Sequence, residues 1–402
     1  MNKETAVKSM LDALKGFHGR FKLIYGQVAL RIDKETYLMS GGNKLFSEIV
    51  EDDLVICDIK DGDFADIFRS RPDINAFIFG CSPDTVTASN ELDSLPTMLE
   101  DAAQLAGPSI PVASDSTPSS ILTCLTSSNI CFVKGTGAVA VGADTKDVVS
   151  GLHILHKACE AYIHGKMLGG NKPLDEKIAA KLKEEYTKNY IPTNDETAQV
   201  TYVGIDSDDF DQRNEVVDYG KNLIRDDLAY GKGGNVSMRL NEHEMLISPS
   251  SMDYFDTHVE DIVRVDIDTL EYGEQRIPSS DAALHAKMYQ ELPGCNAIIH
   301  THSNACSVFA ACEAGFAIPD ENMRQLIGDV KVISYAPDDA ELTINNTIET
   351  LSDTHAAIMP HHGAIFYGPS LEIVYEIAKS VEMVARNLLQ YDVKAESDEE
   401  EV

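Results

Sequence analysis

The chain has 402 residues, of which 43% are hydrophobic and 25% are charged, and its formal net charge is −33. At about 150 residues per domain, this length predicts two or three globular domains. The acidic excess disfavours nucleic acid and anionic membranes as partners, because both carry negative charge. An anionic substrate would need local compensation from backbone N–H groups or a metal ion.

The chain start, Met1–Leu14, has neither a long apolar run nor a cleavage signature, and no stretch of 18 apolar residues occurs anywhere. We therefore expect no secretory signal and no membrane span. The eight cysteines form no Cys-x-x-Cys pair, and several, such as Cys57 and Cys131, sit in apolar runs. This pattern is typical of reduced thiols in a cytoplasmic protein.

The first half of the chain recurs in the second half. Blocks at 25–31, 38–40 and 51–55 return 208 residues later, the block at 75–78 returns 221 residues later, and the block at 137–142 returns 226 residues later. Five blocks in the same order indicate an internal duplication, and the growing offset indicates insertions in the second copy.

Between the copies, the sequence predicts a linker with one helix. The segment 169–173, which begins with two glycines, ends one helix, a charged amphipathic helix follows at about 174–188, and the rest is rich in Asp, Thr and Asn. The acidic block at the end of the chain predicts disorder. The predicted domains are 1–168, a linker at 169–207, a second domain at 208–391 and an acidic tail at 392–402.

In the second copy, apolar spacing predicts a mixture of helices and strands. The helix over 280–292 is expected to be capped by Ser279 or Ser280, and the last helix by Ser370. The predicted helices are 216–228, 280–292 and 370–390, and the predicted strands are 235–240, 244–248, 262–267, 297–300, 356–359 and 364–367.

Two histidines, His300 and His302, follow an apolar strand at spacing i, i+2. Alternate side chains of a strand face the same side, so both imidazoles can reach one metal ion. His362 follows another short apolar strand, and Gly363 leaves room there for a close backbone approach. Asp281, in the first turn of a predicted helix, is the candidate carboxylate near this metal.

Three further histidines are interpreted differently. We expect His361 to lie behind the site or at the surface, since it adjoins His362 and cannot easily bind the same ion. His285 and His355 are expected to be structural.

The ordered set Gly-Asn-Val-Ser-x-Arg, Ser-Pro-Ser, Ser-Ser-Asp, His-Thr-His-Ser and His-His-Gly, followed by a long helix, resembles the class II aldolase/adducin family over nearly the whole second copy. The resemblance implies two tandem α/β/α three-layer domains, each around a mainly antiparallel sheet. It also implies that zinc or another divalent ion is bound by His300, His302 and His362, and that Asp281 is the catalytic acid/base residue. The positions that it assigns to substrate phosphate are Gly234, Asn235, Ser250, Ser279 and Ser280.

The family chemistry is the reversible cleavage of a small phosphorylated ketose through an enediolate, whose negative charge the metal stabilises. Three departures bear on the activity. Asp281 replaces the usual Glu, as in the epimerase branch. Ser251 stands where Gly is usual, and the catalytic tyrosine of the aldolases is absent, with Met323 near its place. A lyase, a ribulose-phosphate 4-epimerase-like enzyme, a decarboxylase or dehydratase and a non-enzymatic adducin-like scaffold remain open.

The first copy is expected to be structural. At the positions equivalent to the three histidines it has Phe79, Cys81 and Thr136. In the family, active sites lie between neighbouring subunits of a cyclic tetramer. The resemblance therefore implies a homo-oligomer in which two tandem chains mimic four subunits.

Overall fold

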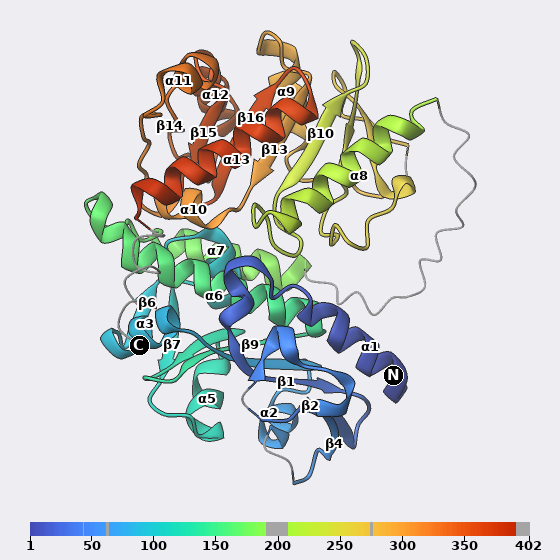
Figure 1. Cartoon of the computed structure of the whole chain (residues 1–402), viewed down its shortest axis with the longest axis vertical. Helices are drawn as coiled ribbons and strands as arrows, with labels where there is room; N and C mark the ends of the chain where they lie inside the picture. The colour runs from blue at the N-terminus through green and yellow to red at the C-terminus, as the bar shows by residue number, and fades with distance from the viewer. Residues whose placement is uncertain (43, 62–63, 190–207, 274–275, 391–402) are drawn as a thin grey trace. The chain divides into compact units, whose positions relative to one another are not determined.

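The computed structural model describes residues 1–42, 44–61, 64–189, 208–273 and 276–390 (Figure 1). These residues divide into two compact units, and each is described by itself. Residues 1–163 and helix α7 (Glu176–Asn189) form the first unit, and residues 164–172 belong with the second copy in the second unit. The predicted acidic tail at 392–402 and residues 190–207 of the predicted linker lie outside the described residues.

The described part of the predicted linker, residues 169–189, is divided between the units. Helix α7 packs against α4 (Glu100–Ala106) of the first unit, and the backbone N–H of Leu174 donates to the carbonyl of Thr97. Residues 164–172 pack against the second copy instead. The amphipathic face of α7 buries apolar side chains, which a free linker helix would leave exposed to water.

The first unit is built on a nine-stranded sheet, counted over the described residues, in the order β4-β2-β1-β5-β9-β8-β7-β6, with β3 pairing β1. The described pairings are antiparallel except that of β7 with β8. Its strands are β1 Tyr25–Arg31, β2 Thr36–Ser40, β3 Lys44–Leu45, β4 Leu54–Asp58, β5 Ala76–Cys81, β6 Ser94–Pro96, β7 Ser109–Ala113, β8 Ile130–Val133 and β9 Gly137–Gly142. Its other helices are α1 Lys3–Leu14, α2 Ala65–Ser70, α3 Pro83–Glu91, α5 Pro118–Leu125 and α6 Thr145–Gly165, which runs into the second unit.

The second unit has seven described strands in the order β12-β11-β10-β13-β16-β15-β14, antiparallel except for the pairing of β14 with β15. The strands are β10 Asn235–Arg239, β11 Glu244–Ile247, β12 Val263–Asp266, β13 Ala297–Thr301, β14 Lys331–Val332, β15 Ala356–Met359 and β16 Gly363–Gly368. The helices are α8 Phe210–Arg225, α9 Ala282–Glu291, α10 Asn304–Ala311, α11 Glu321–Ile327, α12 Ala340–Leu351 and α13 Leu371–Leu388.

The two sheets repeat each other in strand order and in register. Phe79 lies opposite Gln27 in the first sheet, and His300 lies opposite Asn235 in the second. The offsets are 300 − 79 = 221 and 235 − 27 = 208, which are those found by comparing the two halves of the sequence. Register depends on every cross-strand pair, so this agreement confirms the predicted duplication at the level of structure.

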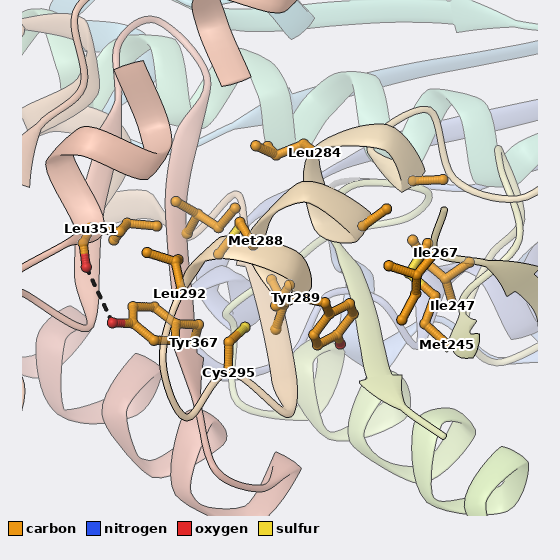
Figure 2. Close-up of a cluster of buried hydrophobic side chains, with 14 of the residues drawn as sticks. Met245, Ile247, Ile267, Leu284, Met288, Tyr289, Leu292, Cys295, Leu351 and Tyr367 are labelled. Atoms are coloured by element: carbon orange, nitrogen blue, oxygen red, sulfur yellow. Dashed lines mark hydrogen bonds between the residues drawn. The ribbon is translucent and has the colours of Figure 1, made fainter. Parts of the chain in front are cut away.

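Helices cover both faces of the second sheet. On one face, α9 and α12 enclose a buried apolar cluster that includes Met288 of α9, Leu292 just after α9 and Ile298 of β13 (Figure 2). At the edge of this cluster, the hydroxyl of Tyr367 donates to the carbonyl of Leu351 at 3.1 Å. Helices α8, α10 and α13 pack against the sheet as well, and Figure 1 shows α13 lying across β13 and β16. The predicted three-layer α/β/α arrangement is therefore confirmed.

The sequence of helix α13 determines where the helix begins and which of its faces packs on the sheet. Ser370 is its N-cap, as predicted, and its side chain accepts a hydrogen bond from the N–H of Ile373. Buried side chains recur every three or four residues, among them Val374, Ala378 and Val381, and form the stripe that contacts the sheet. Among the described residues, no helix combines the length and apolarity needed to cross a membrane.

Candidate active site

Strand β13 carries two of the predicted metal ligands. Ile298 faces the α9 side of the sheet, and side chains alternate along a strand, so His300 faces that side too. His302 follows immediately after the strand ends at Thr301. The Nε2 atoms of His300 and His302 lie 2.8 Å apart, so the two imidazoles do meet on one face.

His362 reaches the pair from the turn between β15 and β16. Strand β16 lies beside β13 with Ala364 opposite Thr301, which places the turn at the same end of the sheet. Each pair of the three imidazole rings has a centroid separation of 4.8 Å. Their candidate ligand nitrogens lie within 4.8 Å of one another, and this is the sole such metal-type cluster among the described residues.

The electrostatics of His300 favour its neutral form. Its Nδ1 atom lies 3.0 Å from the carbonyl oxygen of Ala364, which can only accept, so Nδ1 carries the proton and Nε2 is left with a lone pair. Burial first, and the neighbouring His362 second, lower the pKa of His300 to about 3. A neutral imidazole oriented by a backbone carbonyl is the form that binds metals. Three imidazole nitrogens suit zinc with one position left open, so the residues fit the predicted ion.

Asp281 lies near the histidines, but not in the first helical turn as predicted. Helix α9 begins at Ala282, and Asp281 is its N-cap residue, so the expected capping by Ser279 or Ser280 is wrong. The helix begins two residues later than the predicted start at 280, and the side chain of Ser279 accepts a hydrogen bond from the N–H of Asp281 at 3.3 Å.

The charge state of Asp281 is set by its surroundings. Burial acts to raise its pKa, but His300 and His362, with further help from His285 and a hydrogen bond from Asn235, hold the pKa below its usual value. The Asn235 amide donates to Oδ2 of Asp281 at 2.7 Å. Nothing in the sequence signals this contact across 46 residues. An ionised, oriented carboxylate beside the histidines can accept a proton from a substrate.

The residues assigned to substrate phosphate lie on segments that meet near this end of the sheet. The bridge between Pro249 and Pro278 joins the Ser250 segment to the Ser279–Ser280 segment. Ser250 and Ser280 are exposed, whereas Ser279 is buried. Gly234 has φ +74°, and a Cβ there would lie 2.7 Å from the carbonyl oxygen of His300, so glycine is required.

Ser251 accounts for one departure from the family pattern. Its φ is +58°, the left-handed region in which glycine is favoured. The loop thus keeps the backbone conformation of a glycine at a modest energetic cost to serine.

One helical turn after Asp281, the imidazole of His285 is buried and hydrogen-bonded to a side chain of β10, which agrees with its predicted structural role. Its Nδ1 atom lies 2.8 Å from Oγ of Ser237, and that oxygen lies 2.7 Å from the hydroxyl of Tyr289. The His285–Ser237–Tyr289 network links α9 to β10. It holds the helix whose N-cap is Asp281 against the strand that begins with Asn235.

Acid is expected to destabilise the protein through His285. Burial lowers the pKa of this imidazole to about 4, against about 6.5 in an unfolded chain. Between these values the unfolded state binds a proton that the native state does not, so the free energy of unfolding falls as the pH drops. The slope is at most about 1.4 kcal/mol per pH unit. Urea unfolding at pH 7 and pH 5 should reveal a smaller difference for His285→Gln than for the parent, and an equal difference would contradict the assignment.

The control for this measurement is the exposed His243. Its bond to Asp268 raises its pKa, so a His243→Gln variant cannot lessen the sensitivity to acid.

The proton donor expected of an aldolase is absent from its usual place. Met323, near the position where the family has tyrosine, lies in the short helix α11, which Asp320 caps. Its thioether cannot donate a proton, so the general acid stays unassigned.

At the equivalent place, the first unit has other residues than the three histidines. Phe79 lies on β5 in the register that His300 has on β13, and Cys81 is the last residue of β5. The Cys81 thiol contacts the hydroxyl of Tyr25 at 3.1 Å. One thiol does not make a metal site.

Gly363 is expected to be essential for the metal-site geometry. A Cβ on this residue would lie 2.1 Å from the carbonyl oxygen of Thr301 and 3.4 Å from Cε1 of His300. Gly363→Ala must therefore push β13 and β16 apart, and overpacking of this kind costs about 1–3 kcal/mol. We expect a lower melting temperature and weaker zinc binding. Gly273→Ala, where a Cβ meets nothing within 4 Å, is the control and should leave both unchanged.

Comparison with known protein families shows which family this sequence belongs to. The sequence profile of the class II aldolase and adducin N-terminal domain matches residues 12–163 and, separately, residues 214–389. The chain belongs to the class II aldolase and adducin N-terminal domain family. Both halves match the family, as the duplication predicted.

Relatives of this class II aldolase-family chain are sugar-phosphate enzymes by name. A 5-deoxy-D-ribulose 1-phosphate aldolase from Bacillus thuringiensis serovar kurstaki is 28% identical over 187 residues, 46% of this chain and 86% of that protein. An L-ribulose-5-phosphate 4-epimerase UlaF from Salmonella paratyphi B is 30% identical over 189 residues, 43% of this chain and 82% of that protein. Among solved structures, an L-fuculose 1-phosphate aldolase has a TM-score of 0.42 at 30% identity and covers 44% of this chain and 84% of its own.

Proposed function

We propose that the second unit is a divalent-metal-dependent lyase that reversibly cleaves a small phosphorylated ketose through an enediolate. The observation that carries this proposal is the convergence of three imidazoles within 4.8 Å beside the ionised Asp281. His300, His302 and His362 would hold zinc or a related divalent ion. When bound, such an ion supplies a Lewis acid that stabilises the negative charge developing on the substrate oxygens.

The residues of the chain itself would bind the substrate and move its proton. Oδ1 or Oδ2 of Asp281 would accept the proton of a substrate hydroxyl and later return it, while the Asn235 amide keeps the carboxylate oriented. The hydroxyls of Ser250, Ser279 and Ser280 and the N–H groups around Gly234 would hold the phosphate. Neutral donors suit this task in a chain of net charge −33, because they bind an anion without a cationic side chain.

The aldolase names among the relatives support cleavage, and one observation favours a second candidate. Asp281 in a Ser-Ser-Asp segment resembles the epimerase branch, and an epimerase is among the relatives at 30% identity. Both reactions would use the same ion and carboxylate. They differ in whether a triose phosphate leaves or a hydroxyl-bearing carbon is inverted.

The test is a substrate panel on the full chain with and without added zinc or manganese. L-fuculose 1-phosphate, 5-deoxyribulose 1-phosphate and L-ribulose 5-phosphate are suitable probes. Release of a triose phosphate, measured in a coupled assay, would support the lyase, whereas formation of an epimer, followed by NMR, would support the epimerase. A chain that turns over none of the panel, binds no divalent metal and gains no thermal stability from zinc would be an adducin-like scaffold instead.

We further propose that the first copy serves the assembly rather than the chemistry. Two tandem chains would then take the place of four subunits, in a reducing cytoplasmic setting that suits the eight free cysteines. A mass measurement that finds a fully active monomer would rule this assembly out.

A further inference from the structure

The segment that leaves the first copy is built into the second unit. Residues 164–172 include the end of α6 and the short 3₁₀ helix Lys166–Leu168, and they lie against the end of α10. The N–H of Lys172 donates to the carbonyl of Ala311 at 2.9 Å. The Cys312 thiol lies 3.4 Å from Oδ1 of Asn171, and a Cβ on Gly165 would lie 3.0 Å from that sulfur. This close fit fixes Lys172 at the C-terminal end of α10.

Glu313 connects Lys172 to the turn that carries His362. Its Oε2 atom accepts from Nζ of Lys172 at 2.9 Å, and its Oε1 atom lies 3.2 Å from Nε2 of His361. The carbonyl of Ala310, three residues before Glu313, accepts a hydrogen bond from the N–H of His361 at 3.0 Å. The two carboxylate oxygens of one residue thus join the connecting segment to the residue next to a predicted metal ligand.

Both ends of the Glu313–His361 contact have unusual backbone conformations. Glu313 has φ +47° and His361 has φ +61°, in the left-handed region that side chains with a Cβ disfavour. Such residues persist when their surroundings hold them, and they cluster at functional sites. His361 is buried and its ring also meets the edge of Tyr335 at a centroid distance of 4.7 Å. The turn is therefore held by contacts with side chains that are distant in sequence.

We propose that Lys172, Glu313 and His361 form a positioning chain that fixes the turn so that His362 meets His300 and His302. The inference rests on the proposed metal site and deepens it, because it makes the segment between the copies part of the working second copy. The family pattern assigns no role to Lys172 or Glu313. Neither residue belongs to the three-histidine cluster, so their contribution would be to the geometry of the ligands alone.

Zinc affinity of the full chain tests this proposal. We expect Glu313→Gln, which alters the contact with His361, to weaken zinc binding about 10-fold, the lower end of the range found when partners behind metal ligands are removed. Lys172→Met breaks only a half-exposed ion pair and should weaken it by no more than about 5-fold. The measurement is competition with a chromophoric chelator. Lys172 is about half exposed, and exposed ion pairs contribute little to stability, so the melting temperature of the metal-free Lys172→Met variant should stay that of the parent.

Two further variants separate positioning from a general effect of charge. Lys172→Arg keeps a cation for Glu313 and should restore most of the zinc affinity. Lys331→Met removes another half-exposed lysine of the second unit, paired with Asp353 at 2.5 Å, and should bind zinc as the parent does.

The outcomes distinguish this inference from the proposed function. If His302→Ala loses zinc while Lys172→Met and Glu313→Gln bind it as the parent does, the positioning chain is overturned and the metal site stands. If His302→Ala retains the parent's zinc affinity, the metal site itself is overturned. A Glu313→Gln variant that fails to fold leaves the decision with Lys172→Met, whose exposed side chain can be replaced without disturbing the core.

Discussion

The full chain carrying His302→Ala is expected to bind zinc at least about 100-fold more weakly and to lose sugar-phosphate turnover with it. Loss of a residue behind a ligand already costs about 10–100-fold, and loss of a ligand removes a bond to the ion itself. His302 is the suitable ligand to replace, since its imidazole is half-buried whereas His300 is fully buried. Removing it should leave no large cavity, so the fold should persist. Chelator competition and steady-state assays with added zinc are the measurements.

The matched control is His243→Ala. His243 lies in the same unit, is exposed and contacts Asp268 rather than the cluster. We expect this variant to retain both zinc and turnover. Turnover by His302→Ala at the parental rate, in zinc-depleted buffer, would mean that the reaction does not depend on the three imidazoles.

Much of the fold could be predicted because the duplication provides two independent copies of one pattern. The short strands around the His-His-Gly turn were predicted to within a residue at each end, because each is a run of apolar residues closed by a turn. The start of α8 was predicted six residues late, at 216 instead of Phe210. Its first turns are polar, so apolar spacing does not mark them.

In the candidate site too, some contacts could be predicted from the sequence and others could not. The meeting of His300 with His302 follows from strand alternation, which depends on local sequence alone. The contacts between Asn235 and Asp281 and between Glu313 and His361 join residues 46 and 48 positions apart. They depend on how α9 and α10 are placed on the sheet, and no local pattern encodes that placement. The N-cap position was misassigned because three consecutive residues, Ser279 to Asp281, are all of types that cap helices. Asp281 occupies this position without a side-chain capping bond, and its carboxylate instead accepts from Asn235.

Replacing Asp281 with asparagine is expected to lower kcat by about 10²–10⁴-fold, the usual contribution of a positioned acid/base residue. The substitution keeps the size of the side chain and removes its ability to accept and return a proton. Burial favours the neutral form of the acid, but the nearby histidines and the Asn235 amide hold the pKa of Asp281 down, so the parent carboxylate is ionised at neutral pH. The ionised state is the one that acts as a base. Zinc content and KM should change little, because the ligands and the serines remain in place.

The matched control for this prediction is Asp268→Asn, an exposed carboxylate of the same unit that should leave kcat unchanged. Zinc content measured alongside kcat decides what the Asp281 carboxylate does. If Asp281→Asn loses zinc in proportion to kcat, the carboxylate acts as a metal ligand. If zinc stays and kcat falls, the carboxylate carries the proton. A variant that keeps both would place the base elsewhere, and the candidates would be groups that approach the open side of the three imidazoles.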